Sequence, residues 1–296
     1  MNKITYTFII PHHNCPDLLN RCLDSIPQRK DIQIIVVDDN SDEGKKPKES
    51  QRPEIEYIYI DKSDSKGAGR ARNKGLAKAR GKWLLFADSD DYYNDGFLDI
   101  LDKYKDSFYD IVYFNFEFRD GKTLDILPKL NFQKYFDEFD NSLYAKDCIR
   151  FRHNVPWTKL ISRYYVTKYN LYFEEVPNGN DILFSMMAGY FTKNITVEKD
   201  CVYVYLRNEN SILTTKNQSV DSYLCKITHR IKQNQFYKYI KHPEWRTPLF
   251  QYVISCIHQK GFKLGLSFIV NLYNNIKYKD KDEWIEIIKS RKHNQF

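Results

Sequence analysis

The 296-residue sequence lacks several features that define other protein classes. No apolar run approaches the roughly 20 residues needed to span a bilayer, and the N-terminus lacks the hydrophobic segment of a signal peptide. The six cysteines are scattered without a Cys-x-x-Cys pair, which argues against a zinc site and against a disulfide framework. There is no internal repeat and no low-complexity tract. We therefore expect a cytoplasmic globular protein.

The composition is ordinary, but the charge is unevenly distributed. Hydrophobic residues make up 42% and charged residues 29% of the chain, and the formal net charge is +7. Residues 216–296 hold 15 Lys or Arg against six Asp or Glu, so this part carries +9 and the preceding part about −2. This asymmetry indicates an acidic first part that handles a metal and a basic second part that faces an anionic partner.

Apolar runs alternate with helical patterns in the first third of the chain. We expect strands at residues 6–10, 32–37, 55–60 and 83–87. We expect one helix that begins at Pro16 and a second that ends at Arg80. Asn14 is expected to cap the first helix and Gly81 to end the second. This alternation predicts an α/β fold with an open, mostly parallel sheet covered by helices.

Three polar clusters follow three of these expected strands, at residues 11–14, 38–42 and 88–91. Ligands bind beyond the carboxyl ends of the strands in sheets of this kind, so the three clusters should converge on one site. The third cluster is the most informative, because Asp88, Asp90 and Asp91 follow a buried strand. Alternation along an extended chain points Asp88 and Asp90 to one side and Asp91 to the other. Oxygen ligands held together in this way suit Mg²⁺ or Mn²⁺, although an Asp-rich turn is the simpler alternative.

At this point the sequence resembles the family 2 glycosyltransferases, which have the GT-A fold. The resemblance covers roughly residues 4–213 and rests on four motifs in the family's order: Ile9-Ile-Pro-His-His-Asn14, Val36-Val-Asp-Asp-Asn-Ser41, Ala71-Arg-Asn-Lys-Gly75 and Phe86-Ala-Asp-Ser-Asp-Asp91. It implies a Rossmann-like catalytic domain over residues 1–217. Residues 218–296 would then form a basic, helical C-terminal region.

The resemblance also assigns donor and metal residues. It implies that Pro11 and His13 lie near the nucleotide base and that Asp39 binds the base, with UDP the expected nucleotide. Asp88 and Asp90 would bind the donor and a Mn²⁺ or Mg²⁺ ion. Arg72 and Arg207 are further candidates to contact the diphosphate; for Arg72, an ordinary surface position is the alternative. Gly67-Ala68-Gly69 lacks the third glycine of a dinucleotide fingerprint, and we expect it to form a flexible loop.

The candidate catalytic base is Asp181. Its position at an expected helix start is explained by helix capping alone, since free N–H groups and the helix dipole favour a carboxylate there. The resemblance, however, places the base of the family at this motif, usually as Glu-Asp, and here Asn180 stands in place of the Glu. We also expect the segment from Trp157 to form an amphipathic helix with Trp157 and Leu160 facing inward.

The resemblance implies an inverting hexosyl- or N-acetylhexosaminyltransferase that transfers a sugar to a glycan or lipid-linked acceptor, in capsule, lipopolysaccharide or other surface-polysaccharide synthesis. Apolar residues and lysines over residues 252–279 suggest peripheral contact with the inner face of the cell membrane or with the acceptor's pyrophosphate. A helical cap or a dimer contact is the simpler alternative for the apolar face. Two other functions stay open: nucleic-acid binding by the basic, Tyr-rich tail, which lacks a known nucleic-acid module, and non-catalytic sensing of nucleotide sugars.

Overall fold

The computed structural model describes residues 3–192, 194–208 and 220–250, with isolated positions between 254 and 290. The chain divides into two compact units. The first comprises residues 1–175 and 180–214 and contains the whole sheet; the second comprises residues 176–179 and 215–296. The expected domain boundary after residue 217 lies outside the described residues and stays a prediction.

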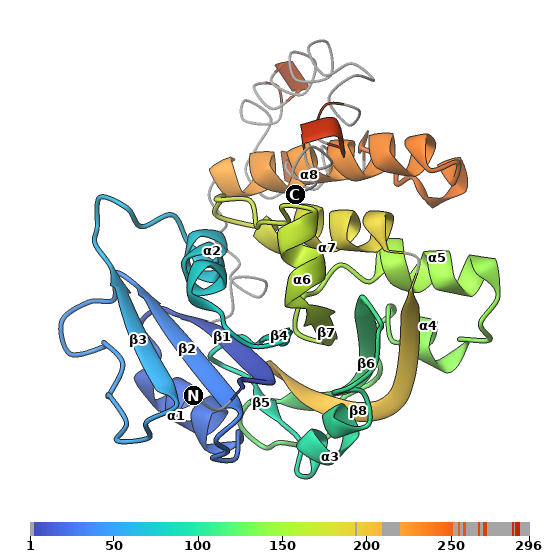
Figure 1. Cartoon of the computed structure of the whole chain (residues 1–296). Coiled ribbons are helices and arrows are strands. Elements are labelled where there is room, and N and C mark those ends of the chain that lie inside the picture. The colour runs from blue at the N-terminus through green and yellow to red at the C-terminus, as the bar shows by residue number, and fades with distance from the viewer. Residues whose placement is uncertain are drawn as a thin grey trace. The chain divides into compact units, whose positions relative to one another are not determined.

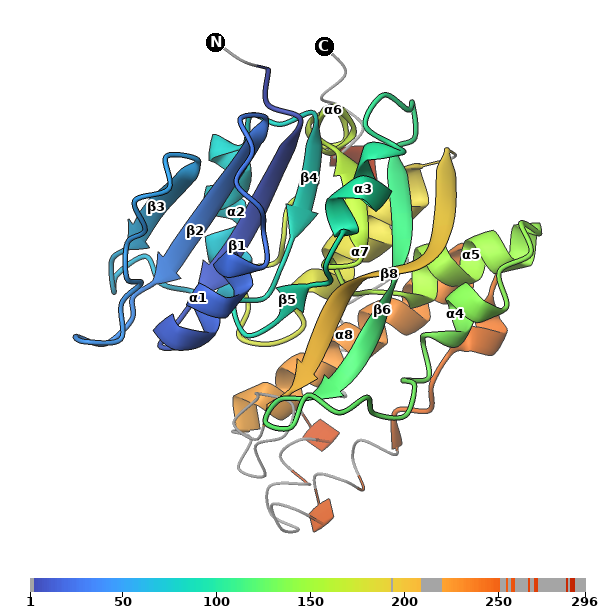
Figure 2. The same ribbon diagram turned by 90° about the horizontal axis from the view of Figure 1, so that it is seen from below.

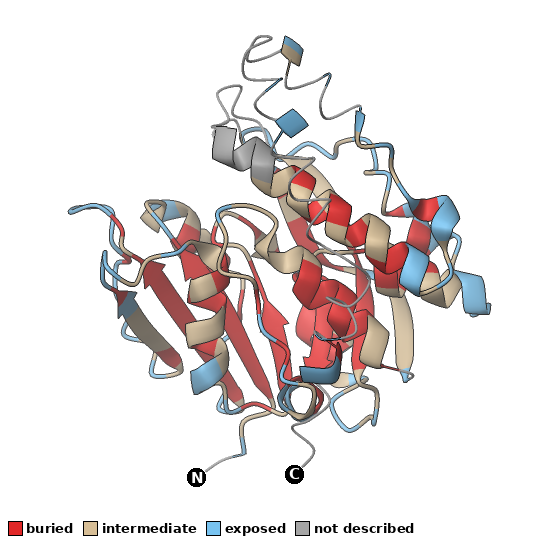
Figure 3. Cartoon of the chain, turned by 90° about the horizontal axis from the view of Figure 1, so that it is seen from above, coloured by how far each residue is buried: buried red, intermediate tan, exposed pale blue. Residues whose placement is uncertain are grey.

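Four parallel strands form the first half of the sheet, as the apolar runs predict (Figure 1). They are β1 (Tyr6–His12), β2 (Ile32–Asp39), β3 (Ile55–Ile60) and β4 (Trp83–Phe86), in the order β3-β2-β1-β4. Every residue of β1, β2 and β4 is buried, because helices cover the sheet; the strands are coloured accordingly in Figure 3. Pro11 is tolerated inside β1 because the pairing with β4 ends at Ile9, so its missing N–H faces no partner there.

Two helices lie on opposite faces of this half of the sheet (Figures 1 and 2). Helix α1 (Pro16–Asp24) buries Leu19, Cys22 and Leu23, and helix α2 (Ala68–Lys78) packs on β1 and β2. Two expected caps are wrong. Asn14 does not cap α1, because its side chain bonds Asp42 instead. Gly81 does not end α2, which stops at Lys78; Gly81 is needed because a Cβ there would lie 2.7 Å from the Thr7 nitrogen.

The second half of the sheet is mixed and extends the order with β7, β6, β8 and β5. Strand β7 (Lys159–Ser162) is antiparallel to β4 and to β6 (Ile111–Asp120), while β8 (Ile195–Arg207) runs parallel to β6 and antiparallel to β5 (Tyr92–Tyr93). The expectation that a helix begins at Trp157 is therefore wrong. Residues 159–162 pair between two strands, and both Trp157 and Leu160 are buried there.

Five further helices lie in the described part of the sheet unit. They are α3 (Phe97–Asp102), α4 (Lys134–Asp137), α5 (Leu143–Arg152), α6 (Arg163–Lys168) and α7 (Asn180–Phe191). Helix α7 packs on α5 and α2, and its residues from Leu183 to Gly189 are buried. Asp181 lies in its first turn, as expected from the sequence.

The second unit contains helix α8 (Val220–Tyr239) and the 3₁₀ helix η1 (Pro243–Trp245), which pack together. Helix α8 buries Ile227, Ile231 and Phe236. Within the residues that the structure describes, no helix is both long and apolar enough to cross a membrane. Most of residues 252–279 lies outside the described residues, so the membrane-contact expectation for that stretch stays a prediction.

Candidate active site

The three polar clusters that follow β1, β2 and β4 come together, as the sequence predicts. His12 Nδ1 is 2.7 Å from Asp38 Oδ1, and the Asn14 side chain bonds Asp42, so the first two clusters are joined. Cys15 Sγ lies 3.1 Å from Ser89 Oγ, which joins the third cluster to them. The parallel register explains this convergence, because β1 pairs with both β2 and β4.

His12, the last residue of β1, and His13, which follows it, have different surroundings. His12 is buried; its Nδ1 faces Asp38, and its Nε2 accepts the Cys15 N–H at 3.3 Å, so its ring is fully engaged in joining the two loops. His13 is exposed, and its Nδ1 lies 3.0 Å from the Asp39 carbonyl oxygen. Of the two, His13 is therefore placed to meet a ligand, next to the candidate base-binding residue.

Asp39 has one engaged and one unengaged carboxylate oxygen. Oδ2 accepts the Gly67 N–H at 2.8 Å, while Oδ1 is buried without a hydrogen-bond partner in the described part of the chain. Leaving a buried carboxylate oxygen unpaired is costly, and such an atom is suited to accept an N–H from a ligand. The bond also corrects the expected loop at Gly67–Gly69. Gly67 caps α2 with φ of 84°, and Gly69 lies in the first turn, where a Cβ would strike the Glu174 carbonyl oxygen at 2.0 Å.

The acidic loop after β4 separates its three carboxylates into two environments. Asp88 and Asp90 are partly exposed, and Asp90 Oδ2 accepts a hydrogen bond from Asn208 Nδ2 at 3.0 Å. Burial and then the charge of Asp88 raise the pKa of the Asp90 carboxyl. The loop is a turn rather than an extended chain, because the Asp91 N–H donates to the Asp88 carbonyl oxygen. Asp88 and Asp90 are thus separated from Asp91 as predicted, but by this turn and not by the alternation of side chains along a strand.

Asp91 is fully buried and connects the loop to β8. Its two carboxylate oxygens accept the Tyr203 hydroxyl at 2.9 Å and the Leu206 N–H at 2.8 Å. Burial is the main cause that raises the pKa of Asp91, followed by the charges of Asp90 and Asp88. The Tyr203 hydroxyl also accepts the Asp88 N–H at 2.9 Å. Asp91 and Tyr203 therefore hold the loop that presents Asp88 and Asp90.

Arg72 connects this loop to the start of α7. Its Nη2 donates to Asp88 Oδ1, its Nη1 donates to Asn180 Oδ1 at 2.6 Å, and its guanidinium lies 5.3 Å from the Phe173 ring centroid. The side chain is buried, which rules out the surface alternative. Its Nε is buried without a partner among the described residues. Arg72 thus brings the acidic motif and the Asn180-Asp181 motif into one constellation.

The environment of Asp181 raises the pKa of its carboxyl. Burial is the main cause; the positive charges of Arg72 and Lys159 oppose it, and the charge of Asp88 adds to it. Lys159 is itself buried, its Nζ donating to the His153 and Val155 carbonyl oxygens, and burial lowers its pKa to about 7. A carboxylate with a raised pKa close to such groups fits a general base.

Arg207 lies apart from the constellation built on Arg72. Its Nη2 donates to Asp120 Oδ2 at 2.7 Å, and about half of its side chain is exposed. The next residue, Asn208, is the one that contacts Asp90. The expected contact of Arg207 with a diphosphate stays a prediction, and Ser211 beyond it lies outside the described residues.

Two carboxylates, Asp88 and Asp90, remain as candidate metal ligands. Within the described residues, no group of three or more His, Cys, Asp or Glu side chains is placed to hold a metal. A Mg²⁺ or Mn²⁺ ion fits the pair nonetheless, because such ions bind through one or two carboxylates and complete their shell with waters and phosphates. The pKa of Asp90 is raised first by burial and then by the charge of Asp88, and a cation bound to the pair would relieve the second effect.

The sequence did not predict the roles of four residues that build this site, although Asn180 was noted there in place of the family's Glu. Asn208, Tyr203 and Lys159 hold or face the acidic residues, and Asn180 holds Arg72. None of them carries a local signal, because each acts through a partner far away in the sequence. For Lys159, the only hint of burial is the pair of apolar residues that follows it, Leu160 and Ile161.

The comparisons with known proteins agree with this geometry. The sequence model of the family described as Glycosyl transferase family 2 matches residues 7–169. The putative glycosyltransferase EpsH of Bacillus subtilis is 26% identical over 229 residues, which are 72% of this chain and 64% of EpsH. The poly(ribitol-phosphate) beta-N-acetylglucosaminyltransferase TarS of Staphylococcus aureus is 26% identical over 210 residues, 68% of this chain and 35% of TarS. The chain thus spans less than two thirds of these relatives.

The solved structures that resemble the chain show the same fold. The structure of S. aureus TarS 1-349 in complex with UDP-GlcNAc gives a TM-score of 0.61 at 20% identity, covering 97% of this chain and 80% of that one. The complex of the same fragment with UDP gives 0.56 at 21% identity, covering 78% and 69%. The predicted α/β fold of GT-A type, with a curled mixed sheet between helices, is therefore confirmed.

Proposed function

The chain belongs to glycosyl transferase family 2, and on that premise we propose that it transfers a sugar from a nucleoside-diphosphate sugar to a hydroxyl group of a glycan or lipid-linked glycan. The observation that carries the proposal is the Arg72 bridge, because it joins a paired-carboxylate motif suited to a diphosphate-bound cation with a partly buried Asp suited to proton abstraction. The bound nucleotides of the TarS structures support a UDP-sugar donor.

We assign the donor nucleotide to the carboxyl ends of β1 and β2. Pro11 and His13 would contact the nucleotide base, and the unengaged Oδ1 of Asp39 would accept a hydrogen bond from the N3–H of uracil. Asp88 and Asp90 would hold Mn²⁺ or Mg²⁺ together with the diphosphate. When bound, the cation would neutralise the charge that develops on the departing diphosphate.

The proposed reaction is a single displacement that inverts the anomeric configuration. Asp181 takes the proton of the acceptor hydroxyl while the hydroxyl oxygen forms a bond to the anomeric carbon. The bond from that carbon to the diphosphate oxygen breaks, and its electron pair leaves with the nucleoside diphosphate. Through its two hydrogen bonds, Arg72 would hold the Asp88 loop and the first turn of α7 in their relative positions during this step.

By similarity to TarS, which is named for its action on poly(ribitol-phosphate), we propose that the reaction belongs to the synthesis of a surface polysaccharide. We further propose that it takes place at the inner face of the cell membrane. A donor screen tests the proposal. Each nucleotide sugar is incubated with the protein and Mn²⁺, and free nucleotide is measured. We expect the protein to release free UDP from a UDP-sugar, and we expect EDTA to abolish this release. Absence of release from every donor, together with tight binding of single-stranded nucleic acid in a filter assay, would favour the nucleic-acid alternative.

A further inference from the structure

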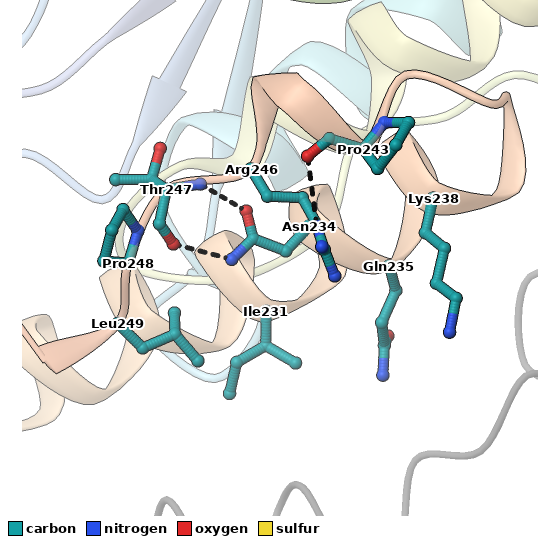
Figure 4. A pocket seen from close by; sticks show the side chains of 9 residues that line it. All are labelled: Ile231, Asn234, Gln235, Lys238, Pro243, Arg246, Thr247, Pro248 and Leu249. Carbon is teal, nitrogen blue, oxygen red and sulfur yellow. Dashed lines mark hydrogen bonds between the residues drawn. The ribbon is translucent and has the colours of Figure 1, made fainter.

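A pocket of about 600 Å³ lies in the second unit, between α8 and the segment that follows η1 (Figure 4). Ile231 and Leu249 and two prolines give it an apolar part, and Asn234, Gln235 and Thr247 give it amide and hydroxyl groups. None of the residues named above for the donor, the metal or the base lines it. The pocket therefore calls for an occupant of its own.

The pocket has a fixed wall. Asn234 Nδ2 donates to the Thr247 carbonyl oxygen at 2.8 Å, and Asn234 Oδ1 accepts the Thr247 N–H at 2.9 Å. These paired bonds hold residues 246–249 against α8, as Figure 4 shows. The Arg246 Nε–H also donates to the Pro243 carbonyl oxygen at 3.1 Å, which positions the guanidinium. A site whose wall is held in this way requires little ordering when a ligand binds.

The charge of the lining has a single sign. Lys238 and Arg246 line the pocket, no Asp or Glu does, and both cations are exposed. Over residues 220–250, neither side chain forms an ion pair with a carboxylate; the nearby Glu244 bonds His242 instead. An ammonium and a guanidinium beside an apolar wall complement a phosphate that carries a hydrocarbon chain.

The residues that follow the pocket in the chain favour a lipid over a water-soluble anion. Phe250 is 60% exposed, and further along the chain Ile254 is 49% and Val270 56% exposed. Exposed apolar side chains next to lysines and arginines are the composition of surfaces that lie at a membrane interface.

We propose that this pocket receives the phosphate headgroup of an anionic phospholipid, with Lys238 and Arg246 on the phosphate and Ile231 and Leu249 against the start of the acyl chains. The proposal goes beyond sugar transfer, since it assigns a membrane-recruiting site to the second unit. It also moves the membrane contact predicted from residues 252–279 to described residues of α8 and the segment after η1.

The test is co-sedimentation of the full chain with vesicles of phosphatidylcholine alone or mixed with phosphatidylglycerol. The variant is the double substitution Lys238→Gln/Arg246→Gln. The matched control is Lys30→Gln/Lys199→Gln, which removes the same charge from exposed lysines of the sheet unit. We expect each pocket cation to account for about fivefold in affinity, so that the pocket variant binds mixed vesicles about 25-fold more weakly while the control changes less than about twofold.

Calorimetry with UDP and Mn²⁺ on the same proteins separates this proposal from the proposed transferase function. Unchanged UDP binding by the pocket variant shows that its sheet unit is folded, and an unchanged helical signal in circular dichroism shows that α8 is retained. Failure of wild-type UDP binding would count against the transferase alone. Equal binding to both kinds of vesicle, equal losses in both double variants, or wild-type affinity of the pocket variant would each overturn the lipid site. Competition by inorganic phosphate as strong as by the mixed vesicles would identify a free-anion site instead.

Discussion

Arg72 Nη1 donates a 2.6 Å hydrogen bond to Oδ1 of Asn180, the residue directly before Asp181. The other terminal nitrogen of Arg72 donates to Asp88, so one guanidinium connects the acidic loop after β4 with the first turn of α7. Both terminal nitrogens are engaged and the side chain is buried, so we propose that Arg72 positions the site; its expected contact with the diphosphate stays a prediction.

The Arg72–Asn180 contact predicts an energetic coupling. We expect a double-mutant cycle of Arg72→Gln and Asn180→Ala to show a coupling of about 0.5–3 kcal/mol in the free energy of unfolding, because the two side chains share a partly buried hydrogen bond. Urea unfolding measures it. The control cycle pairs Arg72→Gln with Thr192→Ala, just beyond the far end of α7, where Thr192 bonds Asp110. Equal coupling in the two cycles would contradict the account.

The unengaged Oδ1 of Asp39 predicts how the base is read. UDP methylated at N3 has no proton to donate to this oxygen, so we expect it to bind at least about tenfold more weakly than UDP, the loss of one charge-assisted hydrogen bond. Asp39→Asn should reduce the discrimination between the two ligands. Calorimetry with Mn²⁺ checks both. Equal affinity of the wild type for UDP and its N3-methyl derivative would remove Asp39 from the base site.

Asp90 and Asp91 are neighbours with different predicted roles. Asp91→Asn places an NH₂ group against the Tyr203 hydroxyl or the Leu206 N–H, so we expect the free energy of unfolding to fall by about 1–3 kcal/mol. Asp90→Asn should leave stability unchanged or raise it slightly, because it removes a charge that Asp88 repels. It should instead weaken Mn²⁺-dependent UDP binding. Urea unfolding and calorimetry on both variants test the assignment, which the reverse pattern would refute.

Lys159 predicts a pH dependence of stability. Its pKa of about 7 in the folded chain lies below its ordinary value of 10.5, so the unfolded chain binds more protons between these pH values. The free energy of unfolding that Lys159 contributes should therefore rise as pH increases from about 7 to about 10. We expect wild type to gain stability relative to Lys159→Met between pH 7.5 and 9.5 in urea unfolding. A difference that is constant or shrinks would mean that Lys159 has an ordinary pKa.

The parallel half of the sheet and its polar edge were predictable from the sequence. Buried strands such as Ile32–Asp39 are continuous apolar runs that end in polar residues, and this pattern is local. Strand β7 was missed because it has only four residues and begins with Lys159, which periodicity alone places on a surface. Its burial follows from pairing between β4 and β6, which is a property of the whole sheet.

The site was predictable residue by residue but not in its connections. Asp39, Asp88, Asp90 and Asp181 carry local patterns, whereas the Arg72–Asn180 bond joins residues 108 positions apart. Likewise, Asn208 reaches Asp90 only because β8 returns beside β6 and its end is tied to the acidic loop through Asp91. Such contacts depend on tertiary structure and leave no spacing in the sequence.

The most direct test of the proposed mechanism is Asp181→Asn, assayed with the UDP-sugar that the donor screen selects. The account predicts that the variant binds this donor and Mn²⁺ as tightly as wild type in calorimetry, because Asp181 has no part in donor binding. Release of free UDP should fall by about 10²–10⁴-fold, because the general base is lost. Release at the wild-type rate by a variant that binds the donor normally would show that Asp181 is not the base.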